Sequence, residues 1–145
     1  MTDYYFIKEI FIKKTFTLSK TERLKSRKLI EQVFGSKQSF NIFPFRVFYL
    51  VLNASAIPLQ AGFGVSTKNF KKAVERNRIK RLLREAYRLQ KNKLYELLIE
   101  KELHLIIFVI FSGKELPDFE LVTGKMEISL QRLINLVNEK PSSNM

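Results

Sequence analysis

Several residue types are missing from this chain or scarce in it, and each absence excludes a kind of site. The 145 residues include no cysteine, which excludes disulfide bonds, thiolate nucleophiles and cysteine-based zinc fingers. His104 is the only histidine, and it stands in a strongly apolar stretch. We therefore expect a core residue there, and neither a histidine pair for acid–base cleavage of RNA nor a Ser–His–Asp set.

Acidic residues are also few. The 14 aspartates and glutamates are spread thinly, whereas a metal-dependent nuclease gathers carboxylates around its ions. No glycine-rich phosphate-binding loop is present either. The sequence thus predicts that this chain has no catalytic residues, no metal site and no small-molecule ligand of its own.

Long apolar segments are absent as well. The longest apolar run, residues 103–111, is far shorter than the ~20 residues that span a bilayer, and charges interrupt the apolar pieces of residues 1–15. Tryptophan, which is common on membrane-binding faces, is missing. We expect a soluble protein without a membrane partner, and the lack of cysteine fits the reducing cytoplasm.

What the chain has in excess is positive charge. Lysine and arginine total 26, the net charge is +12 and the pI is about 10.0. Hydrophobic residues make up 46% of the sequence and include 13 phenylalanines, which is enough apolar material for the core of one domain. A folded body this basic predicts a polyanionic partner.

Residues 70–88 concentrate this charge on one side of a predicted helix. At 100° per residue, apolar residues fall on one face and a cationic stripe on the other. The stripe rises about 18 Å, roughly three phosphate spacings along a nucleic-acid strand, and its arginines suit bidentate phosphate contacts. The apolar face comprises Ile79, Leu82, Leu83, Ala86 and Tyr87; the stripe comprises Arg76, Lys80, Arg84 and Arg88, with Asn77 and Arg81 beside them.

Two other interpretations of the stripe stay open at this point. It could be a solvated basic face, although the only acid at its edge is Glu85, within reach of Arg81 and Arg88. It could also be a DNA-binding basic helix of zipper type. A zipper needs sustained apolar heptads downstream, and here the chain turns into a strand within about two heptads.

The same residues carry a resemblance to a known family. Val65-Ser66-Thr67-Lys68 followed by residues 73–82, with Arg76-Asn77-Arg78 as an Arg-Asn-Arg element, resembles the signature of the protein subunit of bacterial ribonuclease P. The resemblance extends upstream to residues 23–25 and 33–34 and covers most of the chain after about Phe16.

The resemblance implies a function in tRNA maturation. In this family a catalytic RNA subunit holds the Mg²⁺ ions and removes the 5′ leader of precursor tRNA, and the protein assists as a subunit of that endoribonuclease. The protein itself holds no metal ion, although the asparagine of the Arg-Asn-Arg element could orient a metal-bound water. Residues implied to bind the catalytic RNA are Arg76, Asn77, Arg78, Lys80, Arg81, Arg84 and Arg88, and those implied to bind the leader are Phe34, Phe48 and Lys68. Ile30 falls where many relatives carry an aromatic residue.

The secondary structure can be outlined from capping signals and periodicity. A short helix is predicted to begin either at the N-cap Ser26 or earlier, at the capping box Ser19–Glu22. Gly35 is predicted to end the helix as the C′ residue, which can adopt positive φ. Strands are predicted over residues 43–53, 60–66 and 103–111. In the second strand, glycines 62 and 64 would let a backbone or ligand come close. The last helix buries Val122, Met126, Leu130, Leu133 and Val137.

These elements predict an α+β fold, a two-layer sandwich of helices on a central, mostly antiparallel sheet. The resemblance implies the order α-β-β-β-α-β-α with a left-handed βαβ crossover, as in domain 2 of ribosomal protein S5, although most crossovers are right-handed. The predicted organisation is an extension over residues 1–15, the ribonuclease P protein domain over 16–139 and a disordered tail over 140–145. A ribosomal-type RNA-binding protein, an RNA chaperone and a stand-alone nuclease remain the alternatives.

Overall fold

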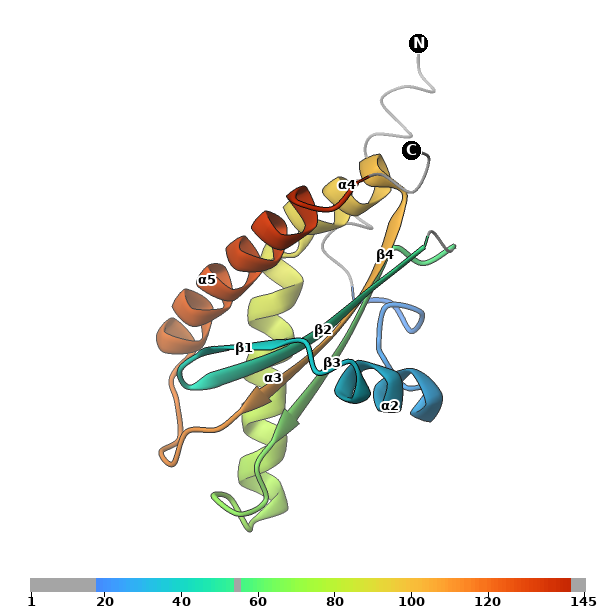
Figure 1. The fold of residues 1–145 in the computed structure, drawn as a ribbon. Coiled ribbons are helices and arrows are strands. Elements are labelled where there is room, and N and C mark those ends of the chain that lie inside the picture. Colours follow the sequence, from blue (N-terminus) through green and yellow to red (C-terminus); the bar gives the residue numbers. More distant parts are fainter. Residues whose placement is uncertain (1–17, 54–55, 142–145) are drawn as a thin grey trace, which may run out of the picture.

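A computed structural model describes residues 18–53 and 56–141 of the chain (Figure 1). The predicted extension over residues 1–15 and most of the predicted tail lie outside the described residues. The elements in chain order are α2 (Arg27–Gly35), β1 (Ser39–Ile42), β2 (Phe45–Asn53), β3 (Leu59–Val65), α3 (Ala73–Gln90), α4 (Asn92–Lys101), β4 (Leu103–Phe111) and α5 (Phe119–Asn138).

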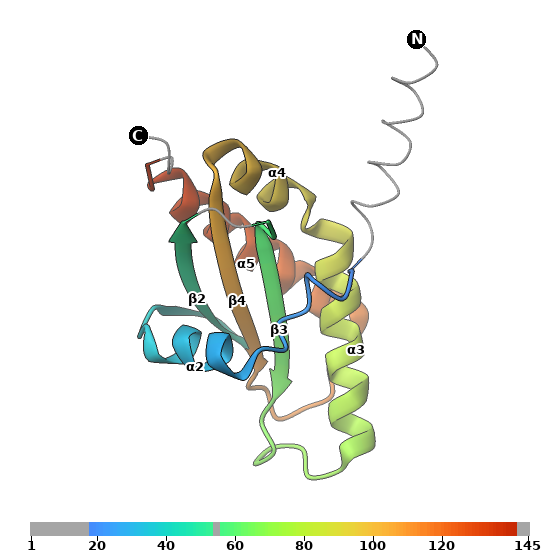
Figure 2. The ribbon, with the colours of Figure 1, turned by 90° about the vertical axis from the view of Figure 1, so that its right-hand side faces the viewer.

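The four strands form one mixed sheet in the order β1-β2-β4-β3. Two of its pairings, β1 with β2 and β2 with β4, are antiparallel, and β3 with β4 is parallel. In Figure 2 both parallel strands point down and β4 lies to the left of β3; α2 lies in front of the sheet, and α3, at the right beside β3, packs with α4 and α5 on the far face. The crossover from β3 through α3 and α4 to β4 is therefore left-handed, and the predicted α+β class with a mostly antiparallel sheet is confirmed.

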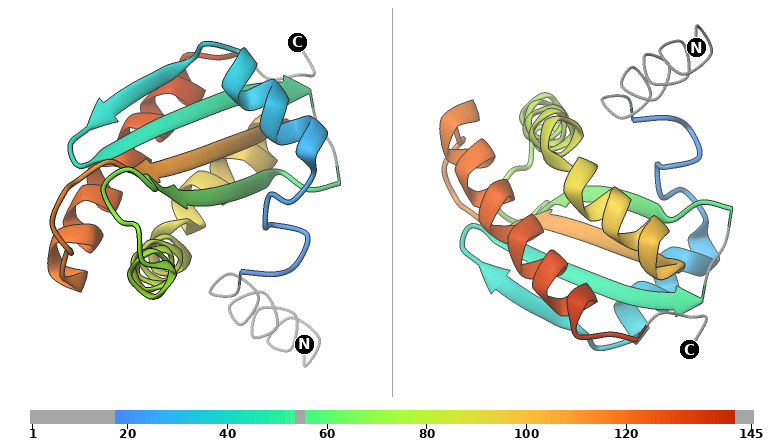
Figure 3. Two further views of the ribbon diagram at one scale, coloured as in Figure 1. Left: turned by 90° about the horizontal axis from the view of Figure 1, so that it is seen from below. Right: turned by 90° about the horizontal axis from the view of Figure 1, so that it is seen from above.

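The helices cover the two faces of the sheet unequally (Figure 3). Helices α3, α4 and α5 pack on one face, called here the helical face, where the large core cluster lies. Of the described helices, only α2 lies on the other, called here the open face, where a smaller cluster has three buried residues, Leu24, Val33 and Ile106, with partly buried ones packed around them. The apolar positions predicted for α5 are all buried: Val122, Met126, Leu130, Leu133 and Val137.

Helix α2 begins where one of the two predicted signals placed it. The Ser26 side chain accepts a hydrogen bond from the Leu29 backbone N–H, as an N-cap does. The Glu22 carboxylate does accept hydrogen bonds from the Ser19 backbone N–H and hydroxyl, but within a turn that precedes the helix. The predicted role of Gly35 was wrong, because Gly35 is the last helical residue and Lys37 takes the positive φ, of 60°.

Two elements were not located by the sequence pattern. Strand β1 precedes residue 43, where the first predicted strand begins, because the chain turns at Phe43–Pro44 and pairs back on β2. Residues 94–98 do not continue the basic helix, because they belong to the separate helix α4. The bend between α3 and α4 lies at Lys91, whose side chain is only 1% exposed.

A short N-terminal segment ties the two faces together at the edge of the sheet. Residues 22–24 run beside β3, with the Leu24 N–H donating to the Ala61 C=O at 2.9 Å and the Ala61 N–H donating to the Glu22 C=O at 2.9 Å. The Glu22 carboxylate pairs with the buried Lys91 ammonium on the helical side, whereas Leu24 belongs to the open-face cluster. The exposed edge of β3 is thereby covered.

Candidate RNA-binding surfaces

The predicted amphipathic character of α3 is confirmed by its burial pattern. The apolar side packs on the helical face, with Ile79, Leu83, Ala86 and Tyr87 buried. Of the cationic residues, Arg78, Arg81 and Arg84 are exposed and make no ion pair with any other residue that the structure describes. Three unpaired guanidinium groups within two helical turns raise the local positive potential and suit a polyanion.

Two arginines of the predicted stripe have partners within the protein. The Arg76 Nη1 donates to the Phe70 C=O at 2.8 Å and to the Lys71 C=O at 2.7 Å, so it holds the loop that enters α3. The Arg88 guanidinium pairs with Glu85 through Nε at 3.1 Å and Nη2 at 2.6 Å. Hydrogen bonding to Arg88 lowers the pKa of the Glu85 carboxyl. The pairing predicted for Glu85 is thus made with Arg88.

An aromatic cluster forms the centre of the open face. The Phe34 ring, at the end of α2, lies edge-on to the Phe48 ring of β2 with centroids 4.7 Å apart. It also lies 5.0 Å from the Phe108 ring of β4. All three rings are half-buried, so part of each contacts solvent. The structure therefore brings together the two aromatic residues that the resemblance assigned to the leader, and adds a third.

Glycines in β3 make room for this third ring. A Cβ at Gly62 would lie 2.6 Å from Cδ2 of Phe108, and one at Gly64 would lie 3.0 Å from Cε1 of the same ring. The sequence predicted the close approach of a backbone or a ligand; the space is instead filled by the Phe108 side chain. Phe108 was missed because its position beside Phe48 follows from the pairing of β2 with β4.

A cation also lies on the aromatic cluster. The Arg46 Cζ lies 4.9 Å from the centroid of the Phe48 ring, which is cation–π distance. Arg46 and Phe48 are two residues apart on β2, so they share the open face. That spacing was visible in the sequence and was the available signal for this residue.

The other two residues considered for the leader side occupy different places. Ile30, on α2, is a half-buried member of the open-face cluster, so it extends the apolar surface without offering a ring. Lys68 is exposed in the loop between β3 and α3. It lies on a different element from the aromatic pair, beyond the end of β3.

The histidine and acidic side chains that the structure describes do not gather in one place. Within residues 18–53 and 56–141, no group of three histidine or acidic side chains is placed to hold a metal ion. The His104 Nε2 lies 2.9 Å from the Gln60 Oε1, and burial lowers the pKa of the imidazole. His104 is a buried strand residue with a polar partner, as its apolar surroundings predicted.

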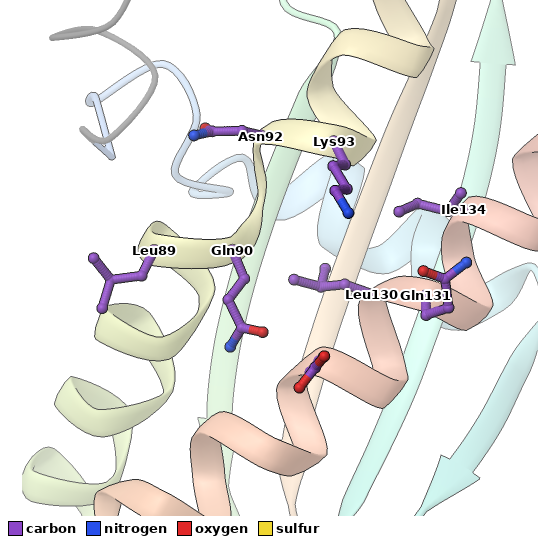
Figure 4. A pocket seen from close by; sticks show the side chains of 8 residues that line it. Leu89, Gln90, Asn92, Lys93, Leu130, Gln131 and Ile134 are labelled. Carbon is purple, nitrogen blue, oxygen red and sulfur yellow. The ribbon is translucent and has the colours of Figure 1, made fainter.

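Separately from both surfaces, a pocket of about 370 Å³ lies where α3, α4 and α5 meet (Figure 4). The Gln90 Nε2 donates to the Ala86 C=O at 3.2 Å and to the Thr123 C=O at 3.1 Å, which joins α3 to α5 beside it. Lys93 and Glu127 contribute one charge of each sign. This mixed lining gives the pocket no preference for an anion.

Fold and surface together define the class: a basic α+β protein that presents a cationic helix and an aromatic sheet face, which are features of nucleic-acid binding. In the described ranges every helix is too short or too polar to cross a membrane. The family model named Ribonuclease P matches residues 18–134. The chain belongs to the ribonuclease P protein family.

Individual relatives agree with this assignment over most of the chain. The chain is 42% identical over 130 residues to the ribonuclease P protein component of Porphyromonas gingivalis, a match that covers 89% of this chain and 93% of that protein. It is 38% identical over 124 residues to the component of Chlorobium phaeobacteroides, covering 78% and 84%.

Solved structures show the same fold. The RNase P protein of Staphylococcus aureus at 2.0 Å resolution aligns with a TM-score of 0.51 and 25% identity, covering 79% of this chain and 94% of that chain. A second structure of the S. aureus protein aligns with a TM-score of 0.52 and 25% identity, covering 83% and 92%.

Proposed function

We propose that this chain is the protein subunit of a ribonuclease P ribonucleoprotein and assists removal of the 5′ leader from precursor tRNA. The observation that carries the proposal is the exposed row Arg78, Arg81 and Arg84 on α3, in a chain that belongs to this family. Polyanion binding at such a row releases counterions from the RNA, which favours association.

In this proposal the two surfaces bind different RNAs: α3 binds the catalytic RNA, and the aromatic cluster binds the leader of precursor tRNA. Asn77 and Lys80 join the three exposed arginines in contacting phosphates of the catalytic RNA. Arg76 and Arg88 lie on the same helix, but they contribute less because each must first exchange a partner within the protein. The aromatic cluster receives bases of the single-stranded leader, because aromatic rings stack with bases at ~1–3 kcal/mol each, and Lys68 contacts its backbone.

The chemistry of cleavage belongs to the RNA subunit in this proposal. The described acids are dispersed, and the protein's contribution is to offset phosphate charge, so that Mg²⁺ ions held by the RNA reach the cut at lower concentration. The protein therefore works in the cell compartment where precursor tRNA is processed, the cytoplasm.

Reconstitution tests the proposal directly. The protein, the catalytic RNA and precursor tRNA are mixed at low Mg²⁺, and the 5′ ends of the products are mapped. We expect 5′ processing that neither the protein nor the RNA gives alone under those conditions. Binding of the RNA without any stimulation of cleavage would indicate a ribosomal-type RNA-binding protein or a chaperone, and cleavage by the protein alone would indicate a nuclease.

A further inference from the structure

We propose that the Arg46 guanidinium forms the outer layer of the leader-binding platform, so that a leader base stacks on Arg46 above the Phe48 ring. This inference rests on the proposed function and names a residue that the family resemblance did not supply. The starting observation is that the guanidinium lies over the Phe48 ring, with the Arg46 Cζ 4.9 Å from the ring centroid.

The register of the sheet shows why Arg46 is accessible. One row across the open face runs through Phe48 and Phe108 to Gly62, and α2 packs over it. The next row runs through Arg46 and Ile110 to Gly64. Arg46 is exposed and Ile110 is half-buried, so this second row faces solvent beside the aromatic cluster.

The second row also lies between the aromatic cluster and Lys68. Gly64, at its end, is followed by Val65, the last residue of β3, and the loop that carries Lys68 comes next. A single-stranded RNA leader that stacks on the aromatic cluster and reaches Lys68 therefore crosses Arg46. This row connects the otherwise separate residues of the predicted leader side.

The chemistry of the guanidinium fits the position. It is planar, it stays charged, and it stacks on aromatic faces while its N–H groups remain free to donate in its plane. A base can thus stack on its outer side, and the adjoining phosphate can accept a hydrogen bond from its edge. Lysine would keep the charge but not the planar surface, which separates stacking from simple charge attraction.

The chain offers a matched control for the stacked pair. The Arg132 Cζ lies 4.7 Å from the centroid of the Phe40 ring, a similar geometry. Arg132 is on α5, and Phe40 is in the core of the helical face, only 6% exposed. Loss of Arg132 removes the same charge and the same type of contact from the opposite side of the sheet.

The experiment measures affinity of the reconstituted complex of protein and catalytic RNA for precursor tRNA and for mature tRNA. Arg46→Ala and Arg46→Lys should each weaken binding of the leader-bearing RNA about two- to fivefold and leave mature tRNA unchanged, whereas Arg132→Ala should change neither. Thermal melting of each variant verifies that it is folded.

A second arm locates the contact. Precursor tRNAs with one abasic leader position at a time are measured with the wild type and with Arg46→Ala, as a double-mutant cycle. We expect one position at which removal of the base costs affinity in the wild type and little in the variant. Strictly additive losses at every position would overturn the proposal, as would full leader affinity in Arg46→Lys or tighter binding in Arg46→Ala.

These measurements distinguish an incorrect role for Arg46 from an incorrect proposed function. If Phe48→Ala weakens binding of leader-bearing RNA selectively while Arg46→Ala does not, only the role of Arg46 is wrong. If the protein neither discriminates the leader nor stimulates cleavage, the proposed function itself is wrong.

Discussion

The two faces of the sheet are formed by the same strands, but they differ in how deeply their side chains are buried. On the helical face, Val47, Leu105 and Val109 are at most 1% exposed beneath three helices. On the open face, Phe48 and Phe108 stay half-buried beneath a single short helix. Because side chains alternate along a strand, adjacent residues of β2 and β4 are buried on one side and partly exposed on the other.

This difference explains why apolar rings remain in contact with water. A partly exposed apolar cluster beside cations contributes less to folding than a buried one, and it suits a ligand that has flat apolar bases and a charged backbone. Substitutions on the two faces should therefore have separable effects, which the following predictions test.

The largest effect on stability is expected on the helical face. Phe111 is 1% exposed and packs against Phe45 and Phe70, with ring centroids 6.4 and 6.0 Å away. Phe111→Ala should lower the free energy of unfolding by about 4 kcal/mol, since it removes buried apolar area and leaves a cavity. Urea denaturation measures this, and a loss below ~1 kcal/mol would contradict the assignment of this face as the main core.

A nearly equal loss of stability is expected at the Glu22–Lys91 ion pair, in the segment that joins the two faces of the sheet. Glu22→Ala leaves the Lys91 ammonium, 1% exposed, without its carboxylate. The expected loss is ~3 kcal/mol, the low end for a broken buried pair, because the Glu22 side chain retains some exposure. Glu85→Ala, which breaks the exposed pair with Arg88, is the control and should change the urea midpoint little. Equal losses for both variants would show that burial of the pair is unimportant.

On the open face, binding should suffer more selectively than folding. Phe48→Ala should cost ~2 kcal/mol of stability, less than Phe111→Ala, because the ring is half-buried. It should weaken binding of leader-bearing tRNA about tenfold and of mature tRNA little, given the strength of base stacking. Titrations with the two RNAs measure the difference, and equal losses for both would instead indicate lost packing.

The smallest effect on stability is expected on the exposed part of α3. Arg84→Ala should change the free energy of unfolding by at most ~0.5 kcal/mol and reduce the slope of log K against log salt by about 0.7–0.9 for binding to the catalytic RNA. Arg132→Ala, an exposed arginine on α5, is the matched control for charge. An unchanged slope in Arg84→Ala would identify the α3 residues as a solvated face.

Most of the fold was predictable because its signals are local. Strand 103–111 was placed with its bounds, and the buried side of α5 followed from helical spacing. Strand β1 and helix α4 were not located, because one depends on pairing with β2 and the other on a bend at the buried Lys91. The left-handed crossover came from family resemblance, since the physics of sheet twist favours the opposite hand.

The sequence by itself determined the basic character of α3 and the separation of its two sides, because helical periodicity and charge are properties of neighbouring residues. Only the tertiary structure decided which arginines stay exposed: Arg76 turns back to the Phe70 and Lys71 carbonyls, whereas Arg84 faces solvent. It also decided that Phe34, Phe48 and Phe108 meet, because these rings come from α2, β2 and β4. Contacts between residues far apart in the chain depend on strand register and helix packing, which no short stretch of sequence encodes.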